Sequence, residues 1–119
     1  MKISALCILA CSVGLAAGAR AACEMPSLVR AIPDGATATE QELLTVQTEI
    51  QAYVAAMDDY IACQNEELSV NGSEASAEYL YMMTTRIETA RNEVDKVASD
   101  FNEQVTAFRA ARQATTTFR

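Results

Sequence analysis

Apolar residues recur at alternating steps of three and four positions along two long stretches of the chain. The first series is Leu43, Val46, Ile50, Tyr53, Val54, Met57, Tyr60, Ile61 and Leu68. The second series is Leu80, Met83, Ile87, Ala90, Val94, Val97, Phe101, Val105 and Phe108. This spacing places the apolar side chains along one stripe of an α-helix. The sequence therefore predicts two amphipathic helices, from about Thr39 to Leu68 and from about Glu74 to Arg112.

The segment between the two stretches, residues 69–73, reads Ser-Val-Asn-Gly-Ser and is typical of a turn. A connection this short makes neighbouring helices antiparallel. No proline follows Pro33 and no glycine follows Gly72, so neither helix contains a residue that would break it. The sequence thus predicts a hairpin of two unbroken helices.

An extended arm is expected before the first helix, over residues 22–36. It contains Pro26 and ends in the turn sequence Ile32-Pro33-Asp34-Gly35. Two threonines follow, Thr37 and Thr39, and each has a glutamate three positions later, as a helix-capping box requires. Either threonine is a candidate for the start of the helix.

These elements predict an all-α protein, an antiparallel coiled-coil-like hairpin over residues 37–113 with a disordered tail over residues 114–119. Two helices offer each other a single apolar stripe, which is a thin core for their length. We therefore expect the hairpin to gain further apolar cover, most simply as a homodimer that forms a four-helix bundle.

Residues 1–21 have the pattern of a cleavable secretory signal peptide. Lys2 gives a positive start, residues 3–18 are uncharged and largely apolar, and Ala19-Arg20-Ala21 supplies small residues at the cleavage positions. A membrane anchor is the alternative, but about 20 apolar residues are needed to span a bilayer. Lipid attachment at Cys11 is a second alternative. We expect removal of this segment, and an exported product with no stable membrane anchor.

Four cysteines become two when Cys7 and Cys11 leave with the signal peptide. Two cysteines in an exported chain favour one disulfide, between Cys23 and Cys63, over two free thiols. Cys63 lies near the far end of the first helix, so this bridge requires the arm to run back along the hairpin. Leu28, Val29 and Ile32 would then cover part of the groove between the helices.

Charge and composition exclude several classes of function. The chain has 9 basic and 16 acidic residues and a net charge of −7, which argues against nucleic acid or anionic lipid as a partner. There is no histidine, so triads and histidine-containing zinc sites are excluded. No Cys-x-x-Cys pair or glycine-rich phosphate loop occurs. We expect a protein that is not an enzyme and has no metal or cofactor.

Four tyrosines and one methionine are the candidate residues for an interaction surface. They are Tyr53, Tyr60, Tyr79, Tyr81 and Met82. Tyr53 and Tyr60 belong to the first apolar stripe, and Tyr79 and Tyr81 lie close to the turn. Packing in the core or at its rim is the simpler interpretation of these aromatic residues, and a contact surface for a partner is the other.

A family resemblance rests on the arm and the first helix. The residues that carry it are Ile32-Pro33-Asp34-Gly35-Ala36-Thr37-Ala38-Thr39, together with Cys23, Tyr53 and Tyr60-Ile61-Ala62-Cys63. In these the chain resembles an uncharacterised family of small exported proteobacterial helical proteins. The resemblance implies a bacterial envelope setting, periplasmic or secreted, and supplies no catalytic residue, ligand or mechanism.

Two hypotheses of function follow from these patterns. The first is a non-enzymatic periplasmic protein-interaction or scaffolding module, with a second copy or an envelope protein as its partner. The alternative is binding of a cationic ligand, a metal ion or a basic peptide, by the acidic first helix. Ten acidic residues and no basic ones lie between Ala31 and Thr85, which motivates this alternative.

Overall fold

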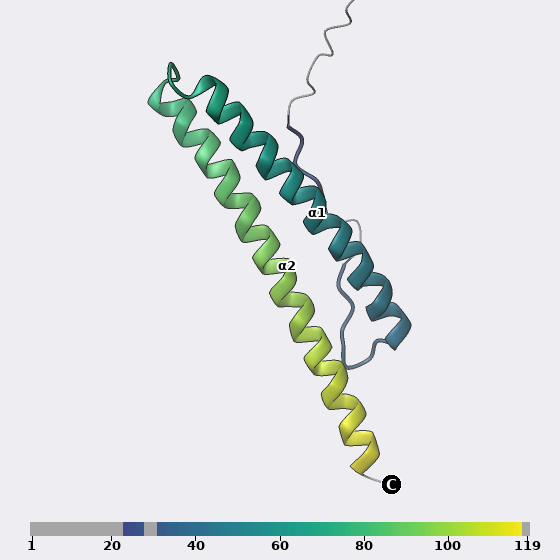
Figure 1. Ribbon diagram of the computed structural model, residues 1–119. Coiled ribbons are helices and arrows are strands. Elements are labelled where there is room, and N and C mark those ends of the chain that lie inside the picture. Colours follow the sequence, from purple (N-terminus) through teal and green to yellow (C-terminus); the bar gives the residue numbers. More distant parts are fainter. Residues whose placement is uncertain (1–22, 28–30, 118–119) are drawn as a thin grey trace, which may run out of the picture.

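The computed structural model describes residues 23–27 and 31–117, and these form an arm followed by two helices (Figure 1). Helix α1 is Glu40–Asn71 and helix α2 is Ala77–Thr117. The two run antiparallel and pack against each other, and the described residues contain no strand. The predicted all-α hairpin is confirmed. The expected signal peptide, Leu28 and Val29 lie outside the described residues.

Helix α1 begins with the second of the two candidate capping boxes. The Thr39 hydroxyl accepts a hydrogen bond from the backbone N–H of Glu42, and the Glu42 carboxylate accepts one from the backbone N–H of Thr39 at 2.8 Å. Each group satisfies a donor that the first helical turn leaves open. The Thr39 hydroxyl also donates to the Glu42 carboxylate at 2.8 Å. The hydrogen bond from the Thr39 backbone is the largest cause of a lowered pKa of Glu42, and the one from the hydroxyl is the second.

The connection between the helices lies slightly later in the chain than the sequence predicted. Helix α1 continues to Asn71, and the backbone N–H of Gly72 donates to the carbonyl of Leu68 at 2.8 Å. Ser76 caps the second helix, because its hydroxyl accepts a hydrogen bond from the backbone N–H of Tyr79. The turn therefore comprises residues 72–76.

The core is the seam between the two stripes. Its buried residues in α1 are Leu43, Val46, Ile50, Tyr53, Met57, Tyr60 and Gln64, and those in α2 are Met83, Ile87, Ala90 and Val97. All but Gln64 belong to the two predicted series. Burial of this seam supplies the main driving force for the fold, at about 25 cal/mol for each Å² of apolar surface removed from water.

Helix α2 extends beyond the predicted end of the hairpin. It runs through Thr117, whereas residues 114–119 were expected to form a disordered tail. The hydroxyls of Thr115, Thr116 and Thr117 each donate to the backbone carbonyl four residues earlier, at 3.0 to 3.1 Å. These local hydrogen bonds are compatible with helical backbone, so the threonines continue the helix.

The arm turns at Asp34 before it enters α1. The Asp34 carboxylate accepts a hydrogen bond from the N–H of Ala36 at 2.9 Å, and its carbonyl accepts one from the N–H of Ala38 at 2.8 Å. Ile32 and Cys23 pack against the core cluster. In Figure 1 the arm runs beside the helix pair toward the end of the hairpin where α1 begins.

Neither described helix is long and apolar enough to cross a bilayer.

Candidate interaction surfaces

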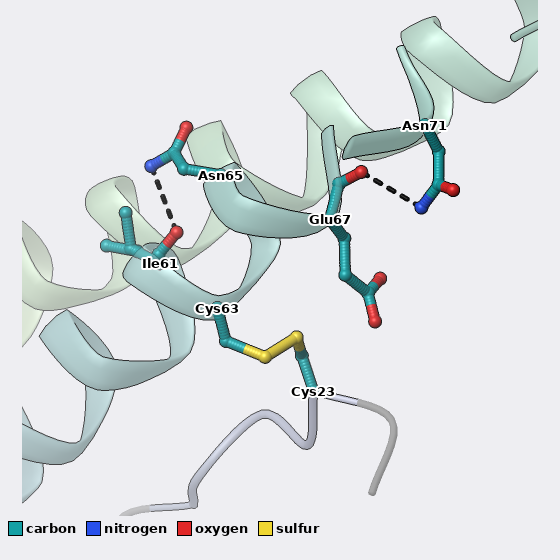
Figure 2. The surroundings of a disulfide bond; sticks show 6 residues. All are labelled: Cys23, Ile61, Cys63, Asn65, Glu67 and Asn71. Atoms are coloured by element: carbon teal, nitrogen blue, oxygen red, sulfur yellow. Dashed lines mark hydrogen bonds between the residues drawn. A yellow bond between two sulfur atoms is a disulfide. The ribbon is translucent and has the colours of Figure 1, made fainter. Parts of the chain in front are cut away.

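A disulfide fixes one end of the arm to α1 (Figure 2). Cys23 and Cys63 are separated by 40 positions in the sequence, and their Cα atoms lie 5.9 Å apart. Both residues are half-buried. The predicted pairing of these two cysteines is confirmed, and it requires the arm to lie against α1.

A second contact fixes the other end of the arm to α2. The backbone N–H of Gly35 donates to the side-chain Oε1 of Gln104 at 2.9 Å. Glycine is required here by the closeness of the two backbones, since a Cβ at this position would overlap the carbonyl oxygen of Gln104. The arm is thus held by α1 at Cys63 and by α2 at Gln104, and it covers one side of the seam.

The arm leaves the opposite side of the seam uncovered. At 100° for each residue of an α-helix, Gln47 points about 160° away from Cys63 around α1. On α2, Val105 and Arg109 point about 100° and 140° away from Gln104. We call this opposite side the open face. It comprises Glu40, Leu44, Gln47, Val54, Asp58 and Ile61 of α1, and Arg91, Ala98, Asn102, Val105 and Arg109 of α2.

The open face contains an apolar groove where α1 begins. The groove has a volume of about 340 Å³. Leu43, Phe101, Val105 and Phe108 form its floor and walls, and Leu44 is 50% exposed at its edge. Polar and charged residues complete the rim: Glu40, Gln47, Asn102 and Arg109. An exposed large apolar side chain above an apolar groove is typical of a protein-interaction site.

The five residues proposed from the sequence fall into two groups. Tyr53 and Tyr60 are buried in the seam, which matches the interpretation that they pack in the core. Burial, and secondly the nearby charge of Glu93, raises the pKa of Tyr53. Near the turn, Tyr79 is half-buried, Tyr81 is 75% exposed and Met82 is 39% exposed. These three remain candidates for a contact surface.

Charge is distributed unequally between the helices. Helix α1 contains seven acidic residues and no basic ones, whereas α2 contains six acidic and five basic residues. Among the described residues, no group of three acidic or cysteine side chains is arranged to hold a metal ion. The acidity of α1 is therefore spread along the helix instead of being concentrated at one site.

Comparison with known proteins found no matching family model, no matching curated protein and no matching solved structure.

Sequence reasoning missed the open face. Leu44 stands outside the main apolar series, and the acidic residues of the first helix favoured a cation-binding hypothesis for that helix as a whole. A signal was available, because Glu40 and Asp58 are separated by eighteen residues and so are Arg91 and Arg109. Eighteen residues are about five helical turns, so each pair lies on one line along its helix.

Proposed function

We propose that this protein is a non-enzymatic interaction or scaffolding module of the bacterial envelope, and that it acts through the open face of its helix pair. The observation that carries the proposal is the apolar groove at Leu44 and Val105, which the arm leaves uncovered. Apolar surface on a helix pair gains free energy when a partner removes it from water.

The composition of the chain supports a binding role over a catalytic one. The absence of histidine removes the commonest general base. The helix pair is held rigid by a long buried seam and a disulfide, and a preorganised surface loses less conformational entropy on binding than a flexible one does.

An exported location is supported by the disulfide. Disulfides persist in oxidising compartments such as the bacterial periplasm and are rare in the reducing cytosol. The pattern of residues 1–21 and the family resemblance favour the same setting.

Site-specific photo-crosslinking in cells tests this proposal. A benzophenone amino acid would replace Leu44 or Val105 on the open face, Tyr81 near the turn, or, as a matched control, Asn92 or Ser99, which are exposed on the outer side of α2. We expect discrete adducts from the two open-face positions and none from the two controls. Adducts from no position at all, in a chain that is exported and folded, would overturn the proposal.

A further inference from the structure

We propose that the partner of the open face is a second copy of this chain, related by a two-fold axis that runs parallel to the helices. This inference rests on the proposed function and names its partner. In the resulting dimer, α1 of each copy lies antiparallel against α2 of the other, and the four helices form a bundle with the arms on its outside.

The register between the helices follows from the turn that joins them, because α1 ends at Asn71 and α2 begins at Ala77. Counted back from this turn, Glu40 lies within one residue of the level of Arg109, and Leu44 lies within one residue of the level of Val105. All four residues line the groove. Each step along α1 is therefore matched by an equal step back along α2. Continued to the middle of the hairpin, this register places Asp58 at the level of Arg91.

The open face thus has an acidic edge and a basic edge at matched heights. Glu40 and Asp58 form the acidic edge on α1, and Arg91 and Arg109 form the basic edge on α2. All four side chains are exposed, and none forms an ion pair with another described residue. The spacing within each edge is the same, about five turns or 27 Å.

A two-fold axis parallel to the helices brings each residue of the acidic edge opposite a residue of the basic edge. It places α1 of one copy over α2 of the other at the same height, so Glu40 faces the second copy's Arg109 and Asp58 faces its Arg91. Because a two-fold interface makes every contact twice, four ion pairs form. An axis perpendicular to the helices would instead oppose α1 to α1, with seven acidic residues on each side. Charge complementarity therefore selects the parallel axis.

Apolar residues fill the space between the two charged edges. Val54, Ile61, Ala98 and Val105 are half-buried on the open face of the single chain, and a second copy would complete their burial. A face of about 45 Å by 20 Å gives roughly 900 Å² for each copy. A standard stable interface buries about 800 Å² for each partner, so the face is large enough.

Charge-swap variants test this dimer in the full chain by sedimentation velocity at concentrations from micromolar to submillimolar. We expect the unmodified protein to be a dimer that dissociates more readily as salt is raised, because the ion pairs are screened. Variant E40R/D58R carries bases on both edges, and variant R91E/R109E carries acids on both. Each variant alone should dimerise at least about tenfold more weakly, because like charges face each other.

Mixing the two variants is the decisive step of the experiment. Every opposed pair is then of opposite charge, so we expect a one-to-one dimer of the two variants. The control R86E/K96E makes the same change in net charge as R91E/R109E. Its two positions are each five residues from Arg91, so their side chains point about 140° away from that of Arg91 around α2. We expect this control to dimerise like the unmodified protein. Circular dichroism spectra of all variants check that they remain helical.

The outcomes separate this inference from the proposed function. A protein that is monomeric at every concentration overturns the second-copy inference, and so does a dimer that the charge swaps leave unchanged. Photo-crosslinks from Leu44 or Val105 to a different envelope protein would overturn it as well, while supporting an interaction module. Crosslinks of twice the chain mass, lost in R91E/R109E and restored on mixing, support both.

Discussion

Gly35 is the residue at which the arm approaches α2 most closely. Its N–H meets the side chain of Gln104, and the absence of a Cβ lets the backbone come near the Gln104 carbonyl. Glycine is required at position 35 because of this contact between distant parts of the chain. It is not required by the backbone conformation, because no described residue has a positive φ angle.

Replacement of Gly35 by alanine tests the contact. We expect Gly35→Ala to lower the free energy of unfolding by about 1–3 kcal/mol, because the new methyl group must push the arm away from the backbone of α2 at Gln104. The neighbouring and exposed Ala36 provides the control, since Ala36→Gly should change stability by less than about 1 kcal/mol. Urea denaturation of the three proteins measures the difference. Equal stability of Gly35→Ala and the unmodified chain would show that the arm does not lie against Gln104.

Thr39 has an equally specific role at the start of α1. We expect Thr39→Ala to destabilise the protein by about 1 kcal/mol through loss of the cap, and Thr37→Ala, at the other candidate threonine, to have an effect of less than about 0.5 kcal/mol. The pKa of Glu42 is lowered in the fold. The contribution of its carboxylate is therefore present above the ordinary pKa and is lost as the pH falls through the lowered value.

Thermal melts at neutral and acidic pH measure this cap. The difference between Thr39→Ala and the unmodified chain should be largest near neutral pH and should shrink in acid, as the pH falls through the lowered pKa of Glu42. A larger loss from Thr37→Ala than from Thr39→Ala would contradict the assignment of the capping box.

At the scale of the helices, the buried seam includes the amide side chain of Gln64 among its apolar and aromatic residues. Gln64 is 1% exposed, and its Oε1 has no hydrogen-bond partner among the described residues. Its position belongs to the α1 stripe, seven residues after the fully buried Met57. A buried acceptor without a partner destabilises a fold by about 1–3 kcal/mol, so Gln64 weakens the seam at this level.

Substitution of Gln64 by leucine should therefore strengthen the hairpin. We expect Gln64→Leu to raise the free energy of unfolding by about 1–2 kcal/mol, since it removes the unsatisfied acceptor and keeps the volume. Asn65→Leu, on the exposed neighbour, is a matched control for added apolar surface and should change stability by less than about 0.5 kcal/mol. A loss of stability in Gln64→Leu would mean that the amide makes a hydrogen bond essential to the fold.

The helices were predictable from the sequence because their information is local and periodic. The apolar steps predicted the stripes, and the threonine–glutamate spacing predicted a cap, although two threonines fitted it equally well. Gln64 was missed because a polar residue interrupts the apolar series, and its burial depends on the opposite helix. The contact of Gly35 with Gln104 was missed because it joins positions 69 residues apart. The end of α2 was missed because threonine has a low intrinsic helix propensity.

The whole molecule is held together unequally along its length. The disulfide joins the arm to α1 near the turn, and the arm reaches α2 at Gln104, whereas α2 continues for about eight residues past the level of Glu40 without α1 beside it. Local opening is easiest where the fewest apolar contacts oppose it. Stability should therefore decrease from the centre of the hairpin toward Thr117.

Removal of the disulfide tests how far the arm contributes. We expect Cys23→Ala/Cys63→Ala to lose about 4 kcal/mol of stability, from the entropy of a closed loop of this length. In hydrogen exchange the amide of Gly35 should lose most of its protection, while amides of Met83 to Val97 should stay the slowest in the chain. Unchanged protection at Gly35 would show that packing, and not the covalent link, holds the arm.

The disulfide also determines how the molecule would respond to a mechanical force applied to its N-terminal end. A load applied before Cys23 passes directly through the two sulfur atoms into α1 at Cys63, and so bypasses the intervening arm and nearly three-quarters of the helix. A tether at that end would shear α1 along α2 with the joined segment intact, whereas after reduction the arm would peel away first.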